Sequence, residues 1–444
     1  MVPVRRLAER TPESRDRPMD LLRAVAIVAV VVGHWLAVHV TYGAEGMSGG
    51  SVLDLVPWTR PLTWLFQVMP IFFLVGGYAN AASLASWRRR GGDAAGWTLH
   101  RTGRLVRPTT ALLAVLTAGA LSARAAGADP RLVGIAVWLA AIPLWFLIAY
   151  LAVVALTPLM YALHRRAGLA VPLALTALVG LGDLARLALG TPEAGQANFL
   201  LAWLAVHQLG FAWRDGLLPT RPAVALPLAL LGLAALVLLT VFGPYPVSMV
   251  GIAGEEIQNT SPPTLALLAL ALAQTGIALL CHDPAARWLR RPRPWTVVVA
   301  VNSVIMTLFL WHMTAAVLGV LALYPTGLFP QPPAGSAEWV LLRLPWLAVL
   351  AVILAALVAV FGPVERRVPP GPAPQGGARG AALALAGVAA VLAGLLGIAV
   401  PGPGDHGPAG LATWALVAYF AGAAVLRYAR GARRGERVPD QGAK

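Results

Sequence analysis

Residues 21–40 read LLRAVAIVAVVVGHWLAVHV, an apolar run that carries an arginine, Arg23, and a histidine, His34. The run is long enough to cross a bilayer as a helix, because a span needs about 20 apolar residues. Eleven helical positions make about three turns, so Arg23 and His34 lie on one side of that helix, roughly 16 Å apart along its axis. An ionisable side chain in a bilayer costs about 2.5–3.5 kcal/mol unless it meets a partner or water, so this pair indicates a site.

The composition extends this interpretation to the whole chain. Of the 444 residues, 58% are hydrophobic and 12% are charged, against about 25% charged residues in soluble domains. We therefore predict an all-α polytopic transmembrane bundle of about twelve spans, with 132–142 as a further short interfacial helix. The predicted spans are 21–40, 61–84, 105–122, 143–163, 168–190, 197–213, 222–242, 263–281, 295–323, 338–361, 381–400 and 410–428.

The basic residues predict the topology of the bundle. The net charge of +15 does not indicate nucleic-acid binding, because the cations lie in short clusters between apolar runs, as the positive-inside rule expects. With both termini cytoplasmic, and with Arg23, Arg107 and Arg427 at the cytoplasmic ends of their spans counted as inside, all but five of the 34 Lys and Arg residues fall in inside segments. The five exceptions are Arg60, Arg124 and Arg131 in outside loops and Arg186 and Arg343 within spans.

The chain is expected to have three parts. A Pro/Gly-rich stretch, 363–380, reads as a cytoplasmic linker. It separates a membrane domain, 1–362, from an accessory transmembrane hairpin and basic cytoplasmic tail, 381–444. The ionisable residues of the last two spans lie near their ends, so we expect the chemistry in the first ten spans. The single cysteine, Cys281, excludes an internal disulfide and a cysteine-based metal cluster, and we expect no metal and no permanently bound cofactor.

A second basic element follows the second span. Arg101, Arg104 and Arg107 recur every three residues, which places them along one edge of a helix. Guanidinium groups in such an array suit phosphate groups, because each can donate two parallel hydrogen bonds. The alternative is an ordinary cluster of positive charge at the cytoplasmic start of a span.

Five motifs in order resemble the acyltransferase family 3 integral membrane proteins, over about residues 15–362. Met19-Asp20-Leu-Leu-Arg23…Gly33-His34 has the family's first-span spacing, and Met69-Pro-Ile-Phe-Phe-Leu-Val-Gly-Gly-Tyr78 is similar to its second-span signature, with Gly76 where serine is usual. The remaining three are Arg101-Thr-Gly-Arg104, Leu144-Trp-Phe-Leu147 and Phe309-Leu-Trp-His312. The glycine at 76 removes any hydroxyl role at that position.

The resemblance implies transfer of an acyl group, usually acetyl, from cytoplasmic acyl-CoA to a hydroxyl of a cell-surface glycan, lipid or secreted metabolite. We expect His34, with Arg23, to be catalytic, as a general base or as a covalent acyl relay. Arg101 and Arg104 are expected to bind the donor. The implied place is the bacterial cytoplasmic membrane, the inner or plasma membrane, with acyl-CoA as co-substrate and the lipid bilayer as partner.

Three further residues are candidates for support of this site: Asp20, His312 and Asn302. Asp20 lies one turn before Arg23 and can pair with it, or be a solvated interfacial acid. Asn302 and His312 can line the same cavity, although a hydrogen bond between helices is the more ordinary role for Asn302.

Two other features have open interpretations. Asp183 and Arg186 form an i,i+3 pair that we interpret as structural rather than as a substrate contact. The outer loop 243–263 either covers an extracytoplasmic acceptor or is a plain connector.

A transporter or flippase that exports a glycan or lipid intermediate is the rival function, with Arg23 and His34 as a proton-coupled gate. The lack of a repeated pattern of interrupted helices argues against it. A membrane scaffold without activity is a third alternative, which the retained arginine motifs and His34 disfavour.

Overall fold

A computed structural model describes residues 4–12, 15–43, 46–366, 378–404 and 406–435. The chain forms two compact units. The first comprises Met1–Ala81, Leu159–Ile305 and Leu318–Ile353, and the second comprises Ala82–Pro158, Met306–Val317 and Leu354–Lys444.

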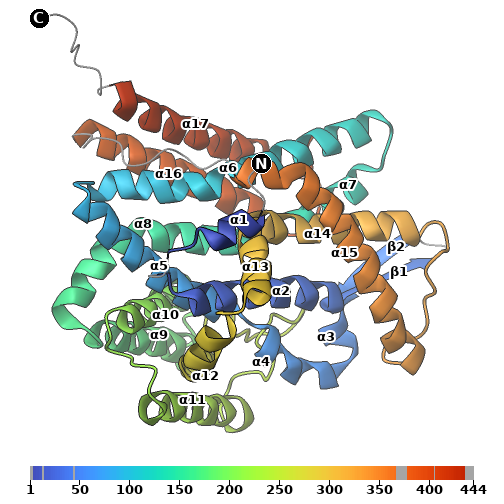
Figure 1. Cartoon of the computed structure of the whole chain (residues 1–444). Helices are drawn as coiled ribbons and strands as arrows, with labels where there is room; N and C mark the ends of the chain where they lie inside the picture. The colour runs from blue at the N-terminus through green and yellow to red at the C-terminus, as the bar shows by residue number, and fades with distance from the viewer. Residues whose placement is uncertain (1–3, 13–14, 44–45, 367–377, 405, 436–444) are drawn as a thin grey trace, which may run out of the picture. The chain divides into compact units, whose positions relative to one another are not determined.

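The described residues form an α-helical protein with ten segments long and apolar enough to cross a membrane. Seven of them are single helices: α2 (Arg17–Ala37), α6 (Ala94–Ala125), α8 (Leu144–Ala167), α9 (Ala170–Ala188), α12 (Leu265–Trp288), α14 (Ile305–Leu323) and α15 (Ala337–Arg366) (Figure 1). An eighth is most of α16 (Ala378–Ala399). The other two are longer than one helix: Pro57–Arg89 ends in α5 (Met69–Arg89), and Pro222–Phe242 contains α11 (Pro222–Val237). The predicted polytopic helical bundle is confirmed.

Two of the twelve predicted spans form helices outside this set of ten. Residues 197–213 form α10 (Asn198–Arg214), which has only 17 residues, and 410–428 form α17 (Thr413–Gly435), whose last turns are basic. The expected short helix before Pro143 is present as α7 (Pro130–Ala141). Its amino terminus is capped by Asp129, whose side chain accepts a hydrogen bond from Arg131 N.

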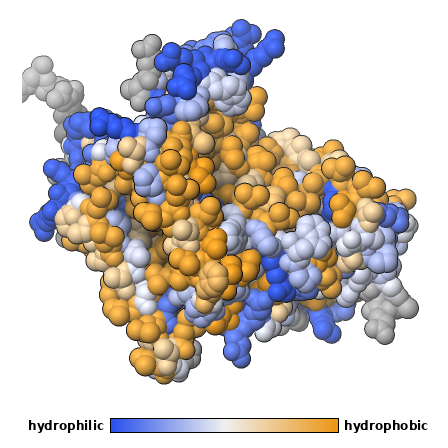
Figure 2. All heavy atoms as spheres, turned by 90° about the horizontal axis from the view of Figure 1, so that it is seen from below, coloured by the Kyte–Doolittle hydropathy of each residue, from blue (hydrophilic) through white to orange (hydrophobic). Residues whose placement is uncertain are grey.

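Large apolar side chains cover much of the surface, as a membrane protein requires. Figure 2 shows broad apolar areas with hydrophilic residues gathered toward the edges of the view. On α15, Leu341 and Leu344 are 66% and 69% exposed. Monomeric soluble proteins rarely expose contiguous apolar surface of this kind, and lipid is the medium that suits it.

The predicted span 295–323 is two helices rather than one, which corrects the prediction. α13 (Pro292–Asn302) ends before Ser303, and α14 begins at Ile305. Asn302 Nδ2 donates to Val298 O at 2.9 Å and Ser303 Oγ to Ala300 O at 2.7 Å. Such local side-chain hydrogen bonds compete with those of a continuous helix.

The first span begins and ends earlier than predicted, because α2 starts at Arg17, ends at Ala37 and is followed by an antiparallel hairpin. Its strands are β1 (Val38–Gly43) and β2 (Gly46–Ser51), with Val38 opposite Ser51. The alternating β-branched residues of β1 favour a strand over a helix. His39, expected at the end of the helical span, therefore lies on β1. Short helices follow, namely α3 (Val52–Leu55), η1 (Pro57–Leu62) and α4 (Thr63–Phe66).

Close backbone contact joins α5 and α10 in the first unit. A Cβ at Gly77 would overlap the carbonyl oxygen of His207, and one at Gly210 would overlap that of Leu74. Glycine at both positions lets the two helices touch. The amino-terminal helix α1 (Val4–Glu9) packs on α13, where Trp295 Nε1 donates to Ala8 O at 3.2 Å.

The loop 243–263, called the outer loop here after its predicted side of the membrane, is a packed structure. Trp64 Nε1 donates to Val247 O and Gln67 Nε2 to Met249 O, both at 2.7 Å. Asn259 is fully buried and donates to Pro246 O and Ser248 O within the loop. The backbone of the loop is thus held against the segment between η1 and α5.

A buried carboxylate holds four elements of the first unit together. Asp183 on α9 accepts hydrogen bonds from Asn198 Nδ2 (3.1 Å), Tyr245 Oη (2.9 Å) and Leu265 N (2.9 Å). Arg186 Nη2 lies 3.5 Å from its Oδ1, which confirms the predicted ion pair. These contacts join α9 to the first residue of α10, which follows the 3₁₀ turn η2 (Pro192–Ala197), to the outer loop and to α12.

The carboxy-terminal hairpin packs on α6 within the second unit. α16 and α17 lie side by side, and both contact α6 (Figure 1). Tyr419 on α17 is fully buried, and its hydroxyl donates to Val106 O at 3.0 Å. The predicted linker 363–380 and the basic tail fall largely outside the described residues.

Candidate functional site

The helix α2 presents His34 and Arg23 in the first unit. Asp16 caps the helix, since its side chain accepts from Met19 N, and Pro18 suits the first turn. Both His34 and Arg23 are half-buried, while Val25 and Val28 on another side of the helix are 56% and 51% exposed. No hydrogen bond or ion pair joins the Arg23 guanidinium to another residue in the described part of the chain.

The contacts of His34 fix the protonation of its ring. Nδ1 lies 3.0 Å from Val30 O, and a carbonyl oxygen can only accept, so Nδ1 carries the proton. In the neutral ring Nε2 then holds the lone pair, which is the form a general base needs. The two residues beside His34 also have contacts. A Cβ at Gly33 would meet the ring of Phe66 at 3.0 Å, and the carbonyl oxygen of Trp35 accepts a hydrogen bond from Trp346 Nε1.

Asp20 pairs with Arg15 and not with Arg23, the partner that the sequence suggested. Arg15 binds it through two hydrogen bonds, from Nε at 2.5 Å and from Nη2 at 2.9 Å, and the side chain is buried. The hydrogen bonds to Asp20 raise the pKa of the Arg15 guanidinium. Asn302 Nδ2 donates to Asp20 O at 2.8 Å, which is the helix-to-helix hydrogen bond of the more ordinary interpretation.

A polar cluster at the amino-terminal end of α2 had no signal in the sequence. Asp16 Oδ2 accepts from Tyr78 Oη at 2.8 Å, and its Oδ1 lies 3.3 Å from His282 Nε2. Burial raises the pKa of Asp16, but the hydrogen bonds from His282 and Tyr78 outweigh burial, so the pKa is below its usual range. The cluster joins α2, α5 and α12, whose contributing residues lie 62 and 266 positions from Asp16.

The second unit holds Arg101 and Arg104 on α6. Asp93 caps this helix by accepting from Gly96 N at 2.7 Å. Arg101 is half-buried and Arg104 is exposed. Arg104 interacts electrostatically with Glu365, near the end of α15. Glu365 itself caps α14, because it accepts from Met306 N (3.0 Å) and from Thr307 N and Oγ1 (both 2.8 Å).

His312 is fully buried on α14, also in the second unit. Its Nδ1 lies 2.6 Å from Phe309 O, so this ring too is protonated at Nδ1. Phe309 packs against Phe146 with ring centroids 5.1 Å apart and an interplanar angle of 70°. The Leu144–Leu147 and Phe309–His312 motifs are therefore in direct contact through an edge-to-face pair.

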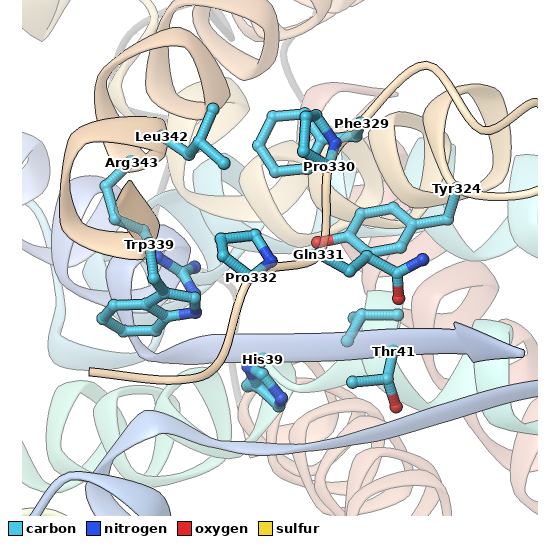
Figure 3. A pocket seen from close by; sticks show the side chains of 11 residues that line it. His39, Thr41, Tyr324, Phe329, Pro330, Gln331, Pro332, Trp339, Leu342 and Arg343 are labelled. Atoms are coloured by element: carbon cyan, nitrogen blue, oxygen red, sulfur yellow. The ribbon is translucent and has the colours of Figure 1, made fainter. Parts of the chain in front are cut away.

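A polar and aromatic pocket lies just beyond the carboxy-terminal end of α2 (Figure 3). Its cavity of about 40 Å³ adjoins a second, more open one of about 290 Å³, and both are lined by His39 and Thr41 of β1. Arg343 lies 3.9 Å from the Trp339 ring centre and donates to Val38 O at 3.0 Å. Gln331 holds the strand, since its amide accepts from Tyr42 N and donates to Tyr42 O. In the sequence, Arg343 stands out as a cation within a predicted span without an assigned role.

The model of the acyltransferase domain of family 3 matches residues 17–364. The chain belongs to acyltransferase family 3. The match contains every candidate site residue and ends before α16, so the carboxy-terminal hairpin lies outside the family domain. Neither a curated protein nor a solved structure matches the chain.

Membership of the family makes this chain a multi-pass membrane acyltransferase. The five motifs lie in the order in which the family resemblance requires them, from α2 to α14. Arg23 and His34 belong to the first unit of the acyltransferase, and Arg101, Arg104 and His312 belong to the second. Within the described residues, no group of three His, Cys, Asp or Glu side chains has the arrangement of a metal site.

Proposed function

We propose that this acyltransferase moves an acyl group, usually acetyl, from cytoplasmic acyl-CoA to a hydroxyl of a glycan, lipid or secreted metabolite in the cell envelope. The observation that supports it most is the match to the family's domain. The hydrogen bond from Nδ1 of His34 to Val30 O, which leaves Nε2 as the basic atom, agrees with it. A bacterial inner membrane with both termini cytoplasmic is the proposed setting, consistent with the distribution of basic residues.

His34 acts in this proposal as the general base. Nε2 takes the proton of the acceptor hydroxyl as the oxygen attacks the thioester carbonyl, and the carbon–sulfur bond then breaks. The departing thiolate takes that proton, which gives CoA–SH and the new ester. In the relay variant Nε2 attacks the thioester first, the carbon–sulfur bond breaks and CoA leaves as the thiolate. The acceptor oxygen later takes the acyl group from the histidine, the bond to Nε2 breaks, and the proton of the hydroxyl ends on the thiolate. Arg23, which lies roughly 16 Å from His34 along the axis of α2, binds a phosphate group of the donor.

Arg101 and Arg104 bind phosphate groups of the donor. A guanidinium can give each phosphate two hydrogen bonds, and positive charge on one helix edge favours a polyanion. The contacts of Glu365 with Met306 N and Thr307 support a role in holding the start of α14 near Arg104.

The proposal is tested with purified protein in vesicles. We expect release of CoA thiol from acetyl-CoA that depends on the protein and on an envelope carbohydrate or lipid fraction, with label appearing in the acceptor. A transporter would move the lipid or glycan without consuming the thioester. Lack of thioester consumption in vesicles that contain folded protein would overturn the proposal.

The pocket at β1 is the proposed place for the acceptor. His39 follows His34 by three residues of helix and two of strand, so the two residues are about 11 Å apart along the chain. The adjoining cavity of about 290 Å³ is close to the lower limit of common ligand pockets, ~300 Å³. Its lining offers hydroxyl, imidazole and carboxylate groups from Thr41, Ser48, Ser51, His39 and Asp54. Such a set suits a polyhydroxylated molecule.

Replacing His39 with alanine is expected to raise the KM for the acceptor about fivefold to tenfold, the loss of one hydrogen bond of ~1–1.5 kcal/mol. His39 lines both cavities, so it is the residue of choice. The slow hydrolysis of acetyl-CoA without acceptor is expected to stay unchanged. Glu338→Gln, at an exposed position of α15 that lines neither cavity, is the matched control. An unchanged acceptor KM in His39→Ala would exclude this pocket.

A further inference from the structure

The carboxy-terminal hairpin reaches the helix that carries the Arg101–Arg104 motif. Tyr419 Oη donates to Val106 O and lies 3.1 Å from Thr110 Oγ1, so α17 is held against α6 one turn beyond Arg104. Both contacts lie within the second unit, and Tyr419 is fully buried. The hairpin is therefore packed on the motif helix although it lies outside the family domain.

Arg430 of α17 lies directly against Gly103, between Arg101 and Arg104 in the sequence. A Cβ at position 103 would overlap Nη1 of Arg430. Glycine in the Arg101-Thr-Gly-Arg104 motif thus leaves the space that the guanidinium fills. Arg430 Nε donates to Leu426 O at 3.1 Å, which directs the side chain along the helix. The side chain is half-buried, whereas Arg427, three residues earlier, is exposed.

The guanidinium of Arg430 adds to a local concentration of positive charge. His100, next to the motif, interacts electrostatically with Arg104, Arg101, Arg430 and Arg90. Like charges that lie close together near a protein surface repel one another. An anion with several charges, placed among such groups, offsets this repulsion and gains charge-assisted hydrogen bonds from more than one side chain.

We propose that Arg430 is a third guanidinium of the donor site and binds a phosphate group of acyl-CoA. The hairpin outside the acyltransferase domain is then part of the substrate-binding surface. This inference rests on the proposed function, because it assigns Arg430 to the same donor as Arg101 and Arg104. It also explains the glycine at position 103, since a side chain there would displace the Arg430 guanidinium.

The test compares Arg430→Gln with Arg427→Gln in the full chain, reconstituted in lipid nanodiscs with acetyl-CoA as the probe. We expect the KM for acetyl-CoA to rise about tenfold to 100-fold in Arg430→Gln, the effect of a lost hydrogen bond between charged groups. The kcat is expected to stay within about twofold. Arg427→Gln should match wild type, and Arg430→Lys should recover part of the affinity because it keeps the charge.

A second variant approaches the same contact from α6. Gly103→Ala adds a methyl group where Nη1 lies, and the long Arg430 side chain can move aside without disturbing the helix. We expect its KM for acetyl-CoA to rise as in Arg430→Gln, with thermal unfolding close to that of wild type. The KM should also depend less steeply on salt in both variants, because one phosphate contact is lost.

The outcomes separate this inference from the proposed function. If wild type consumes acetyl-CoA and folded Arg430→Gln has an unchanged KM, Arg430 is not a donor contact and the inference is overturned. A lower melting temperature with an unchanged KM would overturn it as well, since the side chain would then be purely structural. If wild type itself consumes no acyl-CoA, the proposed function fails without reference to either variant.

Discussion

His34→Ala is expected to lower acyl transfer by a factor of about 10³ or more, because general-base catalysis contributes ~10²–10⁴ and a covalent relay would be lost entirely. The hydrogen bond from Nδ1 to Val30 O holds the ring with Nε2 as its basic atom. No neighbouring side chain on α2 supplies a second base, since the residues around it are Gly33, Trp35 and aliphatic groups. CoA thiol release in vesicles measures the loss.

A matched histidine tests whether the effect is specific. His406 lies in the exposed turn between α16 and α17, where its Nε2 contacts Gly402 O, and His406→Ala should retain wild-type turnover. Both variants should insert equally, because neither change adds a polar group. Turnover of His34→Ala within about threefold of wild type would exclude His34 as base and as relay.

The same experiment separates direct transfer from the relay. Wild type mixed with labelled acetyl-CoA and no acceptor should carry an acid-labile acyl group on His34 if the relay operates. Direct transfer leaves the protein unlabelled, because the base takes only a proton. His34→Ala provides the blank for this labelling.

Most spans were predictable from the sequence for a physical reason. A backbone in lipid must satisfy its hydrogen bonds within the segment, so an apolar run of the right length becomes a helix. The exceptions are places where side chains or turns decide the conformation locally. Asn302 and Ser303 end α13 inside one apolar run, and the alternating residues after Ala37 turn the end of a predicted span into β1.

The sequence predicted which candidate residues lie together on one helix, but not which residues of different elements are in contact. Periodicity placed Arg23 with His34 and Arg101 with Arg104, since each pair lies on one helix. Contacts between elements had no signal in a single sequence. Asp20 binds Arg15 rather than Arg23, Asp16 meets His282 from 266 residues away, and Glu365 caps α14. Arg430 lies among the carboxy-terminal cations, and the sequence pattern explains these cations only by the positive-inside rule.

Asp183→Ala is expected to lower the free energy of unfolding by roughly 3–5 kcal/mol, the effect of removing one partner from a buried ion pair. The substitution leaves the Arg186 guanidinium, whose side chain is 11% exposed, without its carboxylate. It also removes the acceptor of Asn198, Tyr245 and Leu265 N, so α9, α10, the outer loop and α12 lose a shared contact. Thermal unfolding in detergent measures the change.

The double variant Asp183→Ala/Arg186→Ala distinguishes the two interpretations of this pair. If the pair is structural, removing Arg186 as well relieves the uncompensated charge, so the double variant should be more stable than Asp183→Ala alone. The kcat and acceptor KM of the folded fraction should then match wild type in every variant. A raised acceptor KM with a normal melting temperature in Asp183→Ala would instead identify the carboxylate as a substrate contact. Asp183 binds Tyr245 and Leu265 near the two ends of the outer loop. If the pair is structural, the conformation of the loop therefore depends on this one carboxylate of α9.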